Sequence, residues 1–117
     1  MTTDRPGGHV RFDHIAQQVS DIAAAVAWQS ELIPGTRVVY QDATWALVES
    51  GGARLAFVLP EQHPDHIAYR VDDDELEALA RQHRCTIATH RDASRSIYVA
   101  GPDGLQAEFV TYPQRSE

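Results

Sequence analysis

The sequence contains a single cysteine, Cys85, among its 117 residues. One cysteine forms no intramolecular disulfide and provides no thiolate-rich metal site. This usage fits a reducing compartment, and we expect a cytoplasmic protein. The hydrophobic runs are too short to span a bilayer, and residues 1–9 lack the apolar segment of a signal peptide. We therefore expect neither secretion nor a membrane anchor.

Positive charge is scarce as well. Ten Lys and Arg residues stand against 17 Asp and Glu residues, which gives a formal net charge of −7 at pH 7. A nucleic-acid-binding surface needs a basic stripe that displaces counterions from phosphates, and the sequence has none. The same imbalance disfavours docking on an anionic membrane surface. We expect no nucleic acid and no membrane as partner.

What the sequence does have is an internal repeat. Residues 13–21 read DHIAQQVSD and residues 65–73 read DHIAYRVDD, with six of nine positions identical at an offset of 52. At the same offset, LAFV at 55–58 falls on AEFV at 107–110. A repeat of this period predicts a supersecondary unit that occurs twice.

Apolar alternation and turn residues predict the order β-α-β-β-β in each copy. Ser20 or Asp21 is expected to cap the first helix, and glycine-containing turns separate the last two strands of each copy. The first copy is expected to have strands at 10–19, 36–42, 44–50 and 53–60 and a helix at 22–33, and the second copy strands at 66–71, 85–92, 95–100 and 105–112 and a helix at 72–83.

These elements predict one α+β domain that covers residues 11–113. Module one is expected at residues 11–60 and module two at residues 65–113. The remaining residues, 1–10 and 114–117, are expected to be tails.

The repeat places a histidine at the same position of two strands. Because side chains alternate across a strand, His14 and His66 are expected on the sheet face away from the helices. Glu108 interrupts an otherwise apolar strand, and a buried carboxylate is costly unless it is paired or bound to metal. Its counterpart at offset 52 is Ala56. Three of four equivalent positions thus carry metal-ligand side chains.

Two imidazoles and one carboxylate suit Fe(II), Mn(II), Ni(II) or Zn(II), and they leave coordination positions open for a substrate. Taken alone, His14 would be read as a core histidine. The second histidine and Glu108 favour the metal site. His63, which precedes His66 in HPDH, is expected to be a loop residue.

Other polar residues are candidates for a substrate pocket. Tyr98 shares the alternation phase of the open face and is, with Glu108, a candidate catalytic residue, unless it is a structural aromatic. Gln18 and Arg70 lie on the face of the histidines, where a pocket rim and a surface role are both open. His90 and Arg91 belong to THRDASRS, which either meets an anionic substrate or is a solvated hairpin. Gln18, Arg70, His90 and Arg91 are the pocket candidates.

Three motifs, FDHIAQQVSD, DHIAYRVDD and GPDGLQAEF, occur in this order within residues 11–113. In this the sequence resembles the vicinal oxygen chelate superfamily, also called the glyoxalase, bleomycin resistance and dioxygenase superfamily. The resemblance implies two tandem βαβββ modules that form a cup-shaped mixed sheet with the helices outside and a metal inside. It also implies a homodimer.

By this resemblance, His14, His66 and Glu108 match the ligands of the first, fifth and eighth strands. Ala56 stands where glyoxalase I carries a fourth ligand, which argues against glyoxalase I chemistry. Members with three ligands include extradiol dioxygenases and fosfomycin-resistance thiol transferases.

Two functions remain open at this stage. The first is a divalent-metal-dependent enzyme acting on a small oxygenated substrate, with dioxygenase, lyase or isomerase chemistry unresolved. The second is a metal-free protein that binds and sequesters a small molecule or an antibiotic, as other members of that superfamily do. Replacement of Glu108 by Gln separates them, because only the enzyme loses metal and activity.

Overall fold

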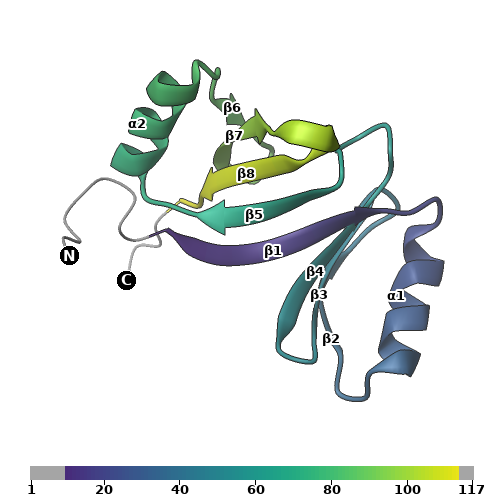
Figure 1. Ribbon diagram of the computed structural model, residues 1–117. Coiled ribbons are helices and arrows are strands. Elements are labelled where there is room, and N and C mark those ends of the chain that lie inside the picture. Colours follow the sequence, from purple (N-terminus) through teal and green to yellow (C-terminus); the bar gives the residue numbers. More distant parts are fainter. Residues whose placement is uncertain (1–9, 114–117) are drawn as a thin grey trace. The chain divides into compact units, whose positions relative to one another are not determined.

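The computed structural model describes residues 10–113. Every helix and strand expected from the sequence is present, and the order β-α-β-β-β occurs twice (Figure 1). The elements are β1 (Arg11–Gln18), α1 (Ile22–Leu32), β2 (Arg37–Gln41), β3 (Trp45–Ser50), β4 (Ala53–Val58), β5 (His66–Arg70), α2 (Asp73–His83), β6 (Ala88–Thr89), β7 (Arg95–Ala100), the short 3-10 turn η1 (Pro102–Gly104) and β8 (Gln106–Thr111).

Strand β6 is much shorter than the eight residues expected at 85–92, and that prediction is wrong in length. Arg84 has a left-handed φ of 57° and ends α2, and the Cys85 N–H donates to the Ala80 carbonyl at 2.9 Å, so the chain leaves the helix late. The His90 N–H donates to the Ser94 carbonyl at 2.8 Å, and this turn begins directly after Thr89. A two-residue strand is left between the two turns.

The strands form a mixed sheet in the order β2-β3-β4-β1-β5-β8-β7-β6. Strand β1 pairs with β4 in parallel, whereas the pairs β2/β3, β3/β4, β6/β7 and β7/β8 are antiparallel. This sheet with its two helices confirms the predicted α+β, glyoxalase-like fold class.

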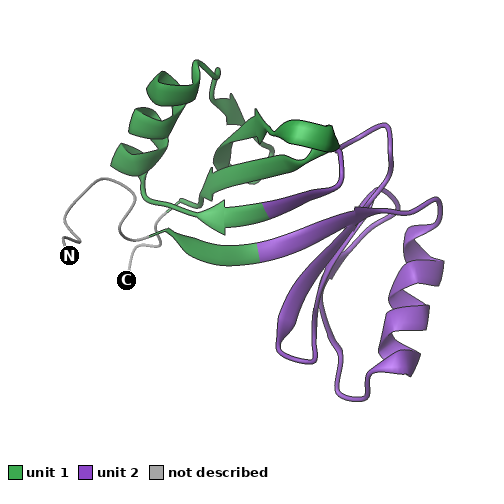
Figure 2. Cartoon of the chain, viewed as in Figure 1, with its two compact units in different colours: residues 1–13, 68–117 green, residues 14–67 purple. Residues whose placement is uncertain are grey.

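The chain divides into two compact units (Figure 2). Unit 2 is residues 14–67, and the described part of unit 1 is residues 10–13 and 68–113. The divisions fall inside β1 and β5, not in the bridge between the modules expected at 11–60 and 65–113. The single domain and its two modules stay predictions, and the expected tails lie outside the described residues except for Val10.

In unit 2, α1 packs on one face of β3 and β4. The buried side chains of this core are Ile22, Val26, Ala46, Val48 and Phe57. Of the two expected caps, the helix uses Asp21, whose carboxylate accepts from the Ala24 N–H at 3.0 Å. Because the core positions alternate along each strand, the intervening side chains lie on the face away from α1.

In unit 1, α2 packs on β7 and β8. Its fully buried Leu76 lies in a core with Val71, Ala80 and Ile97. The helix begins with a capping box, in which the Asp72 carboxylate accepts from the Glu75 N–H at 2.7 Å and the Glu75 carboxylate accepts from the Asp72 N–H at 3.0 Å.

The repeat in the sequence is also a repeat of hydrogen bonds. The Val19 N–H donates to the Val58 carbonyl at 2.8 Å, and the Val71 N–H donates to the Val110 carbonyl at 2.9 Å. Both residues of the second pair follow those of the first by 52 positions. Each module therefore ends its first strand with the same contact to its last strand.

Replacement of Leu76 by Ala is expected to lower the free energy of unfolding by about 3 kcal/mol, because it removes a side chain with 0% exposure and leaves a cavity. The same replacement at Leu105, which is 65% exposed, is the matched control and should change it by less than about 0.5 kcal/mol. Urea unfolding measures both, and equal losses would contradict this assignment of the core.

Candidate metal centre

Two histidine rings lie next to each other in unit 2. His14 is on β1 and His66 on β5, with ring centroids 5.6 Å apart and ring planes at 71°. His66 is buried, at 7% exposure, and His14 is partly buried. The two copies of DHIA thus bring their histidines together.

The ring of His66 is oriented by the bridge between the modules. Its Nδ1 lies 2.7 Å from the Pro64 carbonyl oxygen. Since a carbonyl only accepts, Nδ1 carries the proton, and in the neutral ring Nε2 keeps its lone pair. A ligating histidine in metalloproteins is commonly held by this kind of bond.

The aspartate before each histidine anchors the end of the other module's strand. In unit 2, the Asp65 carboxylate accepts from the Gln18 N–H at 2.7 Å. In unit 1, the Asp13 carboxylate accepts from Arg70 Nε at 3.2 Å and Nη2 at 3.0 Å. Gln18 and Arg70 are 52 positions apart, so the anchored residues correspond in the repeat, although Asp65 holds a backbone N–H and Asp13 a guanidinium group. The repeated Asp-His pair therefore combines an anchor with a metal-type donor.

Glu108 lies on β8 in unit 1 and is buried, at 6% exposure. Its partner on β7 is Tyr98, so the two side chains share one face of the sheet. The Tyr98 hydroxyl donates to the Glu108 carboxylate, and burial, together with the Glu108 charge and this hydrogen bond, holds the pKa of Tyr98 well above its ordinary value. Tyr98 is therefore a protonated donor.

The residue of β7 that pairs with Glu108 depends on the length of the turn between β7 and β8. In unit 2, a two-residue turn with Gly51 and Gly52 at φ 58° and 86° joins β3 to β4, and Leu47 pairs with Ala56. In unit 1, η1 lengthens the turn, and Tyr98 pairs with Glu108, although Val99 is the residue 52 positions after Leu47. The longer turn shifts the register by one residue and thereby brings a hydroxyl to the carboxylate.

Two side chains suggested for a substrate pocket take part in structural contacts. The Gln18 amide donates to the His63 carbonyl at 2.8 Å, which holds the bridge loop. Arg70, besides its bonds to Asp13, lies over the Tyr112 ring at 4.6 Å. A pocket role for Gln18 and Arg70 stays a prediction.

The other two pocket candidates follow β6. His90 Nε2 lies 2.8 Å from the Ser96 hydroxyl, which is fully buried. Ser96 precedes Tyr98 by two residues on β7, so it shares the face of Glu108. Arg91 is exposed. The contact with Ser96 gives His90 a fixed position, and the pocket roles of both residues stay predictions.

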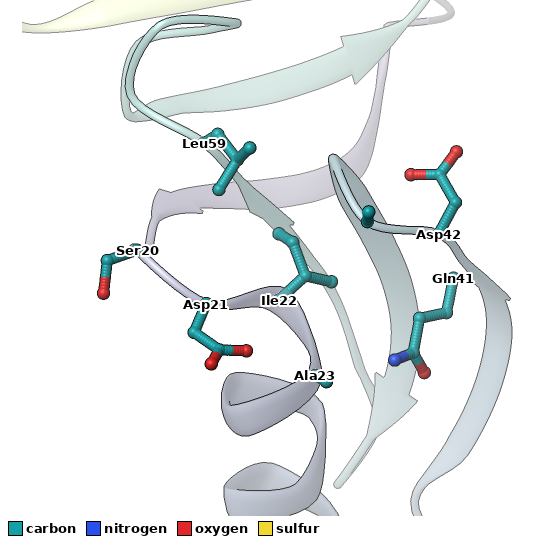
Figure 3. A pocket seen from close by; sticks show the side chains of 8 residues that line it. Ser20, Asp21, Ile22, Ala23, Gln41, Asp42 and Leu59 are labelled. Carbon is teal, nitrogen blue, oxygen red and sulfur yellow. The ribbon is translucent and has the colours of Figure 1, made fainter.

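A pocket of about 550 Å³ lies elsewhere in unit 2, at the start of α1 (Figure 3). It contains none of the predicted site residues. Asp42, on its wall, accepts hydrogen bonds from Tyr40, Thr44 and Trp45, which hold the pKa of its carboxyl far below the usual range. Asp42 is thus committed to the β2–β3 turn. The lining residues of the pocket are Ser20, Asp21, Ile22, Ala23, Gln41, Asp42, Ala43 and Leu59.

Sequence reasoning did not single out one charged residue of β4. Arg54 precedes Ala56 by two positions on β4, so both lie on the face away from α1. The alternation in ARLAFV carries this signal, because Leu55 and Phe57 take the core side.

The hydroxyl of Tyr112 donates to the Asp13 carboxylate at 2.8 Å, and burial and the Asp13 charge raise the pKa of Tyr112 above its ordinary value. Tyr112→Phe is expected to lower the free energy of unfolding by about 1–2 kcal/mol near pH 8, because Asp13 loses a donor. Above about pH 10 the unfolded wild-type chain ionises Tyr112 while the folded chain does not, so wild type loses stability relative to the variant. Urea unfolding between about pH 8 and 11 measures the difference, and a constant gap would contradict it.

No protein-family model and no curated protein matches the sequence. Among solved structures, a glyoxalase/bleomycin resistance protein/dioxygenase superfamily member from Vibrio splendidus 12B01 is similar, with a TM-score of 0.64 and 14% identity. The match covers 87% of this chain and 98% of that one.

Two further matches are parts of longer proteins. The Mn(II)-bound glyoxalase from Novosphingobium aromaticivorans has a TM-score of 0.60 and 17% identity, with 92% of this chain and 42% of that chain covered. An extradiol ring-cleaving dioxygenase from Brevibacterium fuscum has a TM-score of 0.59 and 20% identity, with 89% and 34% covered. This chain therefore spans less than half of either protein. At these identities the likeness concerns the fold, and the chain has the fold of the vicinal oxygen chelate superfamily.

Proposed function

We propose that this protein is a divalent-metal-dependent enzyme and that His14, His66 and Glu108 together hold its metal. The observation that carries the proposal is the pair of neighbouring histidine rings, one of which has its Nδ1 bonded to a carbonyl. The donor types fit Fe(II), Mn(II), Ni(II) or Zn(II). Glu108, a buried carboxylate of β8, is the proposed third donor.

The substrate proposed is a small molecule with two neighbouring oxygen atoms. When bound, the metal supplies Lewis-acid chemistry to these oxygens, or dioxygen activation if it is iron. The chain's own part is to fix the donors. Pro64 sets the tautomer of His66, and Tyr98 donates to Glu108 and limits the ways in which that carboxylate turns.

The candidate reactions are suggested by the similar structures and not by the three proposed metal ligands. A glyoxalase and an extradiol dioxygenase are among the similar structures, and one fold hosts unrelated reactions. Ring-cleaving oxygenation, isomerisation and a lyase step are all compatible with three protein donors and a neighbouring hydroxyl. Ring cleavage by dioxygen is the member of this set that requires a redox-active metal such as iron, so the identity of the bound metal narrows the choice of reaction.

Metal content tests the proposal. Protein purified without a metal-affinity tag is expected to hold close to one divalent ion per chain by plasma mass spectrometry. His66→Ala and Glu108→Gln are expected to lose most of it, because a site of three protein donors keeps only two. His83→Ala, which removes an exposed histidine of α2, is the control and should keep the metal. Wild-type protein without metal, and with none taken up on titration, would overturn the proposal.

Glu108→Gln also separates stability from function. Without metal, the variant is expected to be at least as stable as wild type, because the amide oxygen still accepts from Tyr98 and a buried charge is removed. With metal at 100 times its dissociation constant, wild type should gain about 2.7 kcal/mol and the variant little. Thermal unfolding with and without Zn(II) measures both, and an equal gain for wild type and variant would rule Glu108 out as a ligand.

A metal-free binding protein is the second candidate. Tyr40 and Trp45 stack in unit 2 with ring centroids 4.6 Å apart, and Tyr40 is 42% exposed, so a flat ring could lie against them. A sequestering protein would keep its ligand in Glu108→Gln, whereas the proposed enzyme would lose its activity.

A further inference from the structure

Helix α1 has large apolar side chains on two of its sides. Ile22 and Val26 lie in the core of unit 2, whereas Trp28 and Leu32 are 61% and 53% exposed. Trp28 and Leu32 are four residues apart, so their side chains are neighbours on the helix surface. No other element of unit 2 covers this side of α1 (Figures 1 and 2). We call the exposed residues Ala23, Ala24, Ala27, Trp28, Glu31 and Leu32 the outer face of α1.

The helix at the same place in the second module has a different surface. The exposed side chains of α2 are all polar, namely those of Asp73, Asp74, Glu77, Arg81, Gln82 and His83. The outer face of α1 has one charged residue, Glu31. A helix that is apolar on several sides is typical of one that another element covers. The fold itself does not require such a surface, because α2 takes the same place in the repeat without it.

The remainder of the chain does not supply a cover for the outer face of α1. Residues 1–9 and 114–117, which lie outside the described part, contain no apolar side chain except those of Met1 and Pro6. The cover is therefore expected from another molecule, and an exposed Trp beside a Leu is typical of a protein interface.

The outer face of α1 is complementary to itself. Its N-terminal half has three alanines, and its C-terminal half has the larger side chains. When two copies of α1 pack antiparallel about a two-fold axis between residues 27 and 28, each large side chain meets an alanine, and small residues let helices approach closely. The pairs between the copies are then Trp28 with Ala27, Glu31 with Ala24 and Leu32 with Ala23.

The charges favour the same arrangement. A chain with a net charge of −7 repels a second copy of itself, and this repulsion is weakest across a face with one charged residue. Antiparallel packing brings Glu31 to the first turn of the other helix, where the helix dipole favours a negative charge. The carboxylate at that end, Asp21, is already bonded to the Ala24 N–H. Parallel packing about a two-fold axis would instead place two Glu31 carboxylates side by side.

We propose that the outer face of α1 binds the same face of a second copy of this chain, with the two helices antiparallel. Helix α1 has 11 residues and is about 16 Å long, so one such pair of faces buries less than the roughly 1,200 Å² of a stable interface. The dimer is therefore weak, with a dissociation constant of about 10–100 µM. It does not depend on the proposed function, because α1 contains none of the proposed metal ligands.

Sedimentation velocity from about 5 to 500 µM protein measures this association. Wild type is expected to pass from monomer to dimer over this range, equally with and without Zn(II). Trp28→Ala should raise the dissociation constant about tenfold or more, because it removes the largest side chain of the interface. Leu105→Ala, which removes a 65% exposed side chain of unit 1, is the matched control and should dimerise like wild type.

A charge exchange tests the antiparallel arrangement. Ala24→Glu places a carboxylate against Glu31 of the second copy and should weaken association, whereas Ala24→Lys should preserve or strengthen it. Ala24→Glu combined with Glu31→Lys should restore association. Positions 24 and 31 are seven residues apart, so their side chains do not meet within one helix.

Wild type that stays monomeric at every concentration, or that associates no better than Trp28→Ala, would overturn the inference. A double variant that associates as poorly as Ala24→Glu alone would overturn the antiparallel pairing. Monomeric wild type that sediments with phosphatidylcholine vesicles would assign the outer face of α1 to a lipid surface instead of a second copy.

Discussion

The cost of burying a carboxylate is the constraint on which unit 1 depends. Asp13 and Glu108 are 2% and 6% exposed, and a buried carboxylate without donors would destabilise the fold by several kcal/mol. Asp13 receives hydrogen bonds from Arg70 and Tyr112, and Glu108 receives one from Tyr98. The bonds from Arg70 and Tyr98 join two strands each, and the bond from Tyr112 joins the segment after β8 to β1, so the groups that satisfy the charges also fix the frame around them.

Much of the fold could be predicted because the repeat shows every element twice. Alternation and turn residues located the strands, and β6 was the exception in length. Residues 85–92 are rich in β-branched residues, which favour a strand. However, the hydrogen bond from the Cys85 N–H to the end of α2 and the turn at His90 shorten it, and neither contact can be read from the local sequence pattern. Tertiary and turn contacts override strand propensity there.

The candidate site could be predicted where it follows from the 52-residue repeat of the sequence. His14 and His66 stand at equal places in the repeat, and their rings are adjacent. The pairing of Tyr98 with Glu108 was foreseen only as a shared face, because the register depends on the length of the turn before β8. Arg54 was overlooked, since a lone arginine in a strand has no motif and gains meaning only from the neighbour that strand pairing gives it.

Ala56 shows how a duplicated site gains or loses a ligand at one position of the repeat. It pairs with Ala16 in β1, is 4% exposed, and stands 52 positions before Glu108. The repeat therefore retains, at Ala56, the place of a ligand without its donor, and a carboxylate introduced there would stand at the position that Glu108 holds in the second copy.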